Sequence, residues 1–385
     1  MANAFPYILL IIAYGVLAIL HKYYQDVPNR TTLINILAVF IFIIFFGLRG
    51  FVAYDWTVYY WQYTFNIPTL GNLFHIAITK WPTEPGFTLL ASFCKTIVNN
   101  YIVFQFVCTS LNLFLITRFF KRYTANLSLC LMLFLSMGGL GFSIDLMRNS
   151  LAIFIWLNGI QFIEERKFIP YLAICLVASS FHISAFAYIP MYFILNRKFN
   201  KQIAIIIFIV ANVVCICHIP LLKNIVVFCT NITSRTAAQY IDAYMSMDSN
   251  NASAFGIGYL ERLFTGVMVL CYRDKLCNLR KTNILANSIL LYLFINLFLS
   301  EFRTISVRCS NLFIFAYWIV WQDLAKCIYH KRNKILYLLF IASYCLLKTY
   351  SGNSGTMSQY YNILFDTKSH SERVLYFNKH LNDKE

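Results

Sequence analysis

Long apolar runs recur along the whole chain and leave little sequence for a soluble core. Runs of about 14–20 apolar residues, close to the length that crosses a bilayer, alternate with short basic stretches. The 385 residues are 59% hydrophobic and only 12% charged, whereas soluble domains carry about 25% charged residues. The sequence therefore predicts an all-α, polytopic integral membrane protein.

The apolar runs set the expected helices. The candidate spans are roughly 5–21, 32–48, 101–120, 125–142, 148–163, 202–218, 258–272, 283–300, 305–322 and 334–350, with shorter pieces at 86–98, 169–180 and 183–195. Together they predict roughly 11–14 membrane helices, including short re-entrant or broken pieces. We expect a single membrane domain over residues 1–350 and a polar C-terminal tail over 351–385.

The positive charge of the chain bears on its orientation. A net charge of +16 at pH 7 would suit a nucleic-acid partner, but most of it lies between apolar runs, where basic residues stay in the cytoplasm and contact anionic lipids. We predict membrane lipids as partners and no nucleic acid. The clusters are Lys22/Arg30, Arg118/Lys121/Arg122, Arg166/Lys167, Arg197/Lys198/Lys201, Arg273/Lys275/Arg280/Lys281 and Lys326/Lys331/Arg332/Lys334.

With these clusters inside, the long connections 49–85 and 219–257 and the tail lie outside. The segment 168–196 must then leave and return, which predicts a hairpin or broken helix with Phe181-His182-Ile183-Ser184 near its outer tip. The segment 49–85 must lie outside and the basic cluster that follows residue 117 inside, with only one full span at 101–120 between them. The piece 86–98 is therefore expected to be re-entrant, and its leading Glu84-Pro85-Gly86-Phe87 also faces outward. The aromatic piece 54–65 is expected to be an interfacial helix.

The twelve cysteines do not predict a metal or disulfide framework. Nearly all lie inside apolar runs, without a CxxC pair and without histidines at ligand spacing, so we interpret them as small core residues. We expect no metal and no cofactor.

Charged residues at membrane depth cost about 2.5–3.5 kcal/mol each and are usually functional. On the expected topology, several converge on the outer ends of the helices and would line one cavity. They are Arg49, Asp55, Glu84, Asp145, Arg148, His182, Arg235, Arg303 and Arg308. Because the planar guanidinium fork of arginine pairs with phosphate, and no ATP motif is present, this set favours a polyanionic ligand such as a lipid diphosphate.

Each of these residues also has a purely structural interpretation. Asp145 and Arg148 are spaced i, i+3 and would form an ion pair at a helix end. Arg308 would extend along its helix toward the interface, and His182 would be a hydrogen-bonded core group. The aromatic stripe at 54–65 is more often a membrane belt than a sugar platform.

Four motifs in order resemble one family. They are GLR-x5-D-x3-Y (Gly47-Leu48-Arg49, Asp55, Tyr59), EPGF (84–87), D-x-x-R-x-x-x-A (Asp145, Arg148, Ala152) and FHIS-A (181–185). The pattern resembles the EpsG family of Wzy-like polymerases that make exopolysaccharide and O-antigen, over roughly residues 40–320. Two positions depart from it, because Ala53 replaces a usual glycine and Asn149 replaces a frequent glutamine.

The resemblance implies a GT-C-like glycosyltransferase at the outer face of the bacterial inner membrane. Such an enzyme joins oligosaccharide repeat units carried on undecaprenyl diphosphate, with a chain-length regulator protein as a further partner. Arg148 and Arg49, then Arg235 and Arg303, would stabilise the departing diphosphate. Other residues expected to bind substrate are Arg308, Asp145 and Tyr59.

For the base that removes the hydroxyl proton, the candidates are His182, Glu84 and Asp55; Asp55 would alternatively orient Arg49. Two other functions remain open. A flippase or transporter of lipid-linked oligosaccharide would normally show inverted repeats. An O-antigen ligase-like glycosyltransferase would normally carry a larger outer loop.

Overall fold

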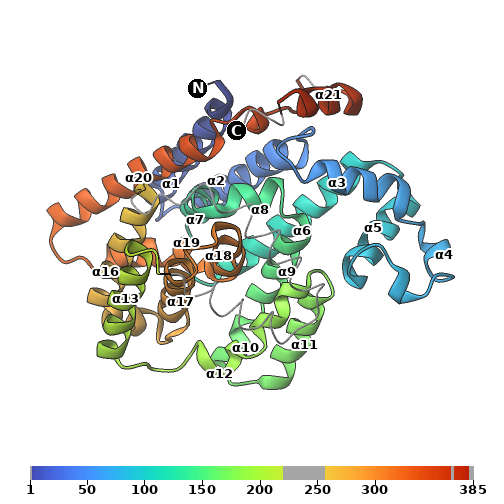
Figure 1. The fold of residues 1–385 in the computed structure, drawn as a ribbon. Coiled ribbons are helices and arrows are strands. Elements are labelled where there is room, and N and C mark those ends of the chain that lie inside the picture. Colours follow the sequence, from blue (N-terminus) through green and yellow to red (C-terminus); the bar gives the residue numbers. More distant parts are fainter. Residues whose placement is uncertain (1, 220–255, 366–367, 381–385) are drawn as a thin grey trace. The chain divides into compact units, whose positions relative to one another are not determined.

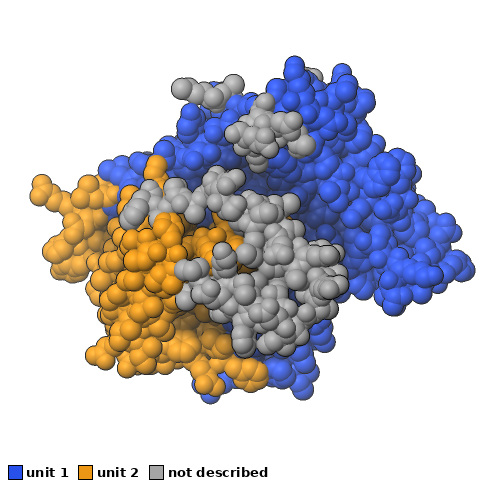
Figure 2. Space-filling view, in the orientation of Figure 1, with its two compact units in different colours: residues 1–192, 337–385 blue, residues 193–336 orange. Residues whose placement is uncertain are grey.

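The computed structural model describes residues 2–219, 256–365 and 368–380. The contacts within the chain divide it into two compact units (Figure 2). The first comprises residues 1–192 and 337–385, and the second comprises residues 193–336. The expectation that residues 1–350 form a single membrane domain stays a prediction.

All named secondary-structure elements in the described residues of the first unit are helices (Figure 1). Its elements are η1 (Ala2–Ala4), α1 (Phe5–Tyr23), α2 (Pro28–Phe42), η2 (Ile43–Gly47), α3 (Trp56–Trp61), η3 (Gln62–Asn66), α4 (Leu70–Leu73), η4 (Ile78–Lys80), α5 (Pro85–Ile97), α6 (Tyr101–Lys121), α7 (Leu127–Phe134), η5 (Leu135–Gly139), α8 (Leu140–Ile144), α9 (Met147–Leu157), α10 (Ile160–Glu164), α11 (Phe168–Ser179), η6 (Ile183–Tyr188), η8 (Thr356–Ser358) and α21 (His370–His380).

The second unit contains α13 (Lys201–Ile216), α16 (Ile257–Arg280), α17 (Ile284–Phe298), α18 (Arg303–Ser310), η7 (Asn311–Phe313) and α19 (Phe315–Cys327). The boundaries between the units fall within α12 (Met191–Ile194) and α20 (Lys331–Asn353). Among the described residues, five helices are long and apolar enough to cross a membrane, or six if the bent pair Arg303–Phe313 and Phe315–Cys327 is one span. The prediction of an all-α, multi-pass membrane protein is confirmed.

Several expected spans are broken by identifiable residues. The run 125–142 kinks at Gly138, whose φ of 91° is accessible to glycine at little cost. The run 148–163 divides into α9 and α10 at Asn158, whose side-chain amide donates to the carbonyls of Leu115 and Phe154. At Gly159 a Cβ would come within 2.8 Å of Ile174, so the glycine permits α11 to pack closely.

The basic cluster 273–281 is not a loop as expected, because α16 continues to Arg280. Arg280 forms a bidentate pair with Asp323 at 2.6 and 2.7 Å, and the Asp323 side chain is only 1% exposed. Arg273 is buried and donates to the carbonyl of Phe199 and to Asn287. Partners far along the chain therefore keep this basic segment helical.

The tail packs against the loop that follows η2. The backbone N–H groups of Gly50 and Ala53 donate to the carbonyls of Tyr361 and Met357, at 2.9 and 3.1 Å, and Ile363 donates to Leu48. A buried arginine adds a side-chain contact, because Arg373 of α21 donates from Nε to the carbonyl of Phe51 at 2.8 Å. The tail is thus part of the first unit.

We predict that Arg373→Ala releases the tail. The side chain is 1% exposed and its guanidinium lies 4.8 Å from the ring centroids of both Tyr361 and Tyr376. Its loss leaves the Phe51 carbonyl without its donor, at a cost of about 1–3 kcal/mol. Thermal unfolding in detergent and limited proteolysis of the tail measure the effect. Lys379→Ala, at an exposed site on the same helix, is the control; equal protease resistance of the two variants would contradict the prediction.

Candidate active site

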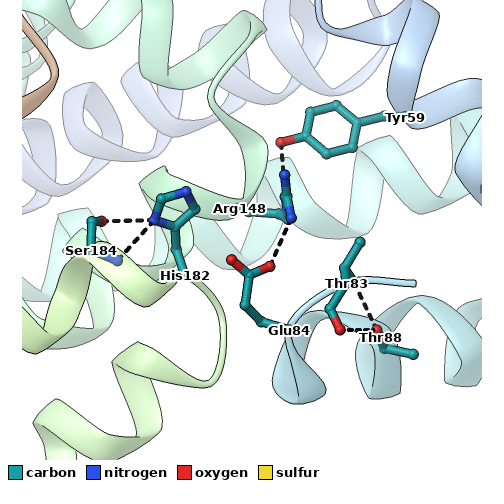
Figure 3. Close-up of polar contacts among 7 residues, drawn as sticks. All are labelled: Tyr59, Thr83, Glu84, Thr88, Arg148, His182 and Ser184. Carbon is teal, nitrogen blue, oxygen red and sulfur yellow. Dashed lines mark hydrogen bonds and ion pairs between the residues drawn. The ribbon is translucent and has the colours of Figure 1, made fainter. Parts of the chain in front are cut away.

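The candidate site is built around Arg148, near the start of α9 (Figure 3). Its Nη1 lies 2.7 Å from Oε2 of Glu84, and its Nε donates to the hydroxyl of Tyr59 at 3.4 Å. The side chains of Arg148 and Glu84 are 27% and 20% exposed. Three of the residues expected from sequence are therefore brought together: Arg148 from α9, Glu84 from the residue that precedes α5, and Tyr59 from α3. The alternative pairing of Arg148 with Asp145 is not the one that the structure forms.

Glu84 is fixed by the turn that starts α5. Pro85 occupies the first helical position, where its missing N–H costs nothing. The N–H of Gly86 donates to the carbonyl of Ser180 at 2.7 Å. The hydroxyls of Thr83 and Thr88 lie 2.7 Å apart and close the turn. The EPGF motif therefore docks against the end of α11, with its carboxylate turned to Arg148.

His182 lies at the predicted break, between α11 and η6. Its Nδ1 lies 2.7 Å from Oγ of Ser184 and 3.2 Å from the backbone N of that residue. Oγ of Ser184 in turn donates to Oδ1 of Asn149 at 3.1 Å. Because Asn149 follows Arg148 in the chain, hydrogen bonds connect the histidine to the helix that carries the arginine.

Arg49 is buried in this structure and connects neighbouring elements. Its side chain is 4% exposed and donates to the carbonyls of Phe46 and Ile144 and to the hydroxyl of Thr109. These bonds tie the end of η2 to α6 and α8. The hypothesis that Asp55 orients Arg49 stays a prediction.

Asp145 holds the loop that carries Asp55. Its Oδ1 accepts the backbone N–H groups of Tyr54 and Asp55, both at 3.1 Å. Burial and the neighbouring Asp55 carboxylate raise the pKa of Asp145 to about 6, although the two N–H donors act in the opposite direction. The loop is therefore anchored by a carboxylate that is itself partly protonated in mildly acidic solution.

The other arginines expected to bind substrate are Arg235, Arg303 and Arg308. Arg235 lies outside the described residues. Arg303 and Arg308 are exposed residues of α18 in the second unit. On the buried side of that helix, Ser306 donates to the carbonyl of Asn296 at 3.2 Å. Their roles in binding substrate stay predictions.

Sequence reasoning missed Lys95, in the middle of a short apolar arm. Its Nζ donates to the carbonyls of Tyr63, Thr64 and Ile67, at 2.8, 2.9 and 2.7 Å. The ammonium group thus satisfies carbonyls at the end of the aromatic helix. A single lysine within residues 86–98 was the available signal. For metals, the described residues contain no cluster of three His, Cys, Asp or Glu that could hold an ion.

We predict that Ala53→Gly stabilises the protein. Ala53 has a φ of 64°, a left-handed conformation that costs an L-residue about 1–2 kcal/mol. Glycine adopts it freely, although its larger backbone entropy in the unfolded chain offsets part of the gain. Thermal unfolding should therefore shift upward. In the control Ala77→Gly, at a φ of −57°, no strain is relieved, so an equal rise in both variants would contradict this account.

A comparison with known proteins identifies the family of the chain. The model of the EpsG family matches residues 32–362, a range that includes Arg49, Tyr59, Glu84, Arg148 and His182 and ends before α21. No curated protein and no solved structure matches the chain. The chain therefore belongs to the EpsG family, a family of Wzy-like polymerases.

Proposed function

We propose that this protein joins undecaprenyl-diphosphate-linked oligosaccharide repeat units at the outer face of the bacterial inner membrane. Family membership already makes it a multi-pass, exopolysaccharide or O-antigen polymerase-like membrane protein. The proposal adds the lipid-diphosphate donor, the compartment and the residues. The glycan leaves one lipid diphosphate and forms its new glycosidic bond with a hydroxyl of the next unit.

The observation that carries the proposal is the placement of Arg148. Glu84 and Tyr59 engage its Nη1 and Nε, which leaves Nη2 without a hydrogen-bond partner among the described residues. A partly exposed guanidinium held in this way presents N–H donors in a fixed direction. Charge fixed before the reaction stabilises the negative charge that develops on a departing diphosphate. Arg148 is therefore proposed to bind the leaving group.

Among the three candidate bases, we favour His182 over Glu84 because of the contacts that Glu84 makes. Glu84 already pairs with Arg148, and a guanidinium neighbour stabilises the carboxylate and weakens it as a base. When Nδ1–H of His182 donates to Oγ of Ser184, and this hydroxyl donates to Asn149, Nε2 carries no proton. Nε2 then accepts the proton of the attacking hydroxyl. The backbone N–H of Ser184 donates to Nδ1 at 3.2 Å and favours the opposite tautomer, in which Nε2 is already protonated. The proposed base therefore requires the tautomer in which Nδ1–H donates to Oγ of Ser184, 2.7 Å away.

The first test is Arg148→Lys, which keeps the charge and loses the planar fork. We expect polymer formation to fall by about 10²-fold, as for the loss of one preorganised donor, so that the glycan ladder collapses to single repeats. The matched control is Arg122→Lys, because Arg122 also pairs with a carboxylate, Glu164, at 3.1 Å. A wild-type ladder from Arg148→Lys would exclude the residue from the site.

The same assay discriminates between the alternatives. Loss of a flippase abolishes all surface glycan, including single repeats, and loss of a ligase leaves polymer on undecaprenyl diphosphate. Single repeats without polymer identify a polymerase.

The second test addresses the histidine tautomer. Ser184→Ala removes the acceptor for Nδ1–H while the backbone N–H of residue 184 remains, which favours the proton on Nε2. We expect polymerisation to fall by at least about tenfold, within the range of general-base catalysis, with little change in thermal unfolding. Ser184→Thr, which retains a hydroxyl, is the matched variant and should recover activity. Full activity in Ser184→Ala would remove His182 from the role of base.

A further inference from the structure

A cavity in the first unit lies beside the aromatic helix α3. It has a volume of about 340 Å³, within the range of about 300–1,000 Å³ typical of small-molecule sites. Rings provide much of its wall, from Phe51, Tyr60, Tyr63, Tyr101 and His370. The mechanism proposed above uses none of these residues. His370 belongs to α21, which lies beyond the end of the family match.

The wall of the cavity favours an uncharged ligand. None of the described residues that line the cavity is Asp, Glu, Lys or Arg. Burial lowers the pKa of His370, so its imidazole is neutral at pH 7. An anion such as a diphosphate would therefore meet no charged side chain in the wall, and the neighbouring ammonium group of Lys95 already donates to three carbonyls.

Neutral polar groups complete the wall. Thr64, Asn99 and Asn100 line it together with the rings. The hydroxyls of Tyr60 and Tyr101 make no hydrogen bond with other described residues, so they remain able to pair with a ligand. A pocket of aromatic faces and uncharged donors and acceptors matches a sugar ring, whose C–H faces pack on aromatic surfaces and whose hydroxyls need hydrogen bonds.

The position of His370 is fixed by local structure. The imidazole stacks on Tyr60, with ring centroids 3.8 Å apart and planes 16° apart. Ser369 and Glu372 form a capping box at the start of α21. The Glu372 carboxylate accepts from the backbone N–H of Ser369 at 2.8 Å, and the backbone N–H of Glu372 donates to Oγ of Ser369 at 3.3 Å. One turn along, Arg373 binds the Phe51 carbonyl. The tail therefore holds the ring rigidly in the wall.

We infer that this cavity is a subsite for uncharged sugar rings of the glycan, and that His370 and Tyr60 determine which saccharide it accepts. The identity of the ligand as a glycan rests on the proposed function. The subsite would hold the saccharide part of a repeat unit, while Arg148 binds the diphosphate. One cluster of buried residues includes Phe51, Tyr59, Tyr63 and Tyr101, and it connects the cavity to the residue that contacts Arg148.

The test measures saccharide binding apart from polymerisation. The full chain in nanodiscs is titrated with oligosaccharide repeat units released from the producing cell's glycan by mild acid, and with inorganic pyrophosphate. Saturation-transfer NMR reports binding directly. Tryptophan fluorescence also reports it, because the ring centroids of Trp56 and His370 lie 5.6 Å apart. We expect His370→Ala and Tyr60→Ala each to weaken saccharide binding about tenfold, the upper range for one aromatic contact. Pyrophosphate binding should weaken only in Arg148→Lys.

Two further variants separate the subsite from simple loosening of the tail. Phe377→Ala removes another ring of α21, which contacts Tyr54 and Trp56 but does not line the cavity; its saccharide affinity should stay close to wild type. His370→Phe retains the stacking surface and loses the ring nitrogens, so it should bind more tightly than His370→Ala. A loss of affinity in Phe377→Ala equal to that in His370→Ala would overturn the inference.

The outcomes also distinguish this inference from the proposed function. Unchanged saccharide affinity in both His370→Ala and Tyr60→Ala, with polymer still produced by the wild type, overturns the subsite and leaves the polymerase intact. Saccharide binding that depends on His370, with no polymer formed from lipid-linked units, overturns the polymerase and leaves the subsite. A lipid chain that fills the cavity and is not displaced by the saccharide also overturns the subsite.

Discussion

The contact between Gly86 and Ser180 is the constraint on which the candidate site depends. A Cβ at position 86 would lie 2.4 Å from the Ser180 hydroxyl and 2.9 Å from its carbonyl oxygen, so the approach requires glycine. Through this contact the start of α5 docks against the end of α11. Glu84 and His182, each two residues from the contact, therefore belong to the same small region. Arg148 is linked to both, directly to Glu84 and through Asn149 to the histidine.

The Arg148–Glu84 pair explains how the site remains stable without ligand. A half-buried guanidinium loses much of its hydration, and a carboxylate at 2.7 Å compensates for this loss. In the proposed reaction, the diphosphate supplies the negative charge when it binds beside this pair. Glu84 then acts as a positioning residue that keeps the guanidinium directed before the substrate arrives, which is the condition for effective electrostatic catalysis.

The sequence predicts the local features of this protein and misses most long-range partners. Apolar runs identify the helices, and Pro85 identifies the turn before α5. The break at 181–184 follows from placing the basic clusters on both sides of it in the cytoplasm. The i, i+3 rule instead favours a pair between Asp145 and Arg148, whereas Arg148 binds Glu84, which lies 64 residues earlier in the sequence. Asp145 binds backbone N–H groups that no side-chain pattern could reveal. The choice among possible partners depends on the packed geometry, as does the docking of a tail that composition describes only as polar.

The loop after η2 explains why the distant tail matters for the site. Ala53 is held in its left-handed conformation by a bond to Met357, and Asp145 binds the two residues that follow. These bonds fix the entry into α3, where successive side chains diverge by about 100°. Tyr59 therefore contacts Arg148 while Tyr60 stacks on His370. A single short helix thus separates a charged contact from a neutral, aromatic one, as a ligand with a diphosphate end and a saccharide end would require.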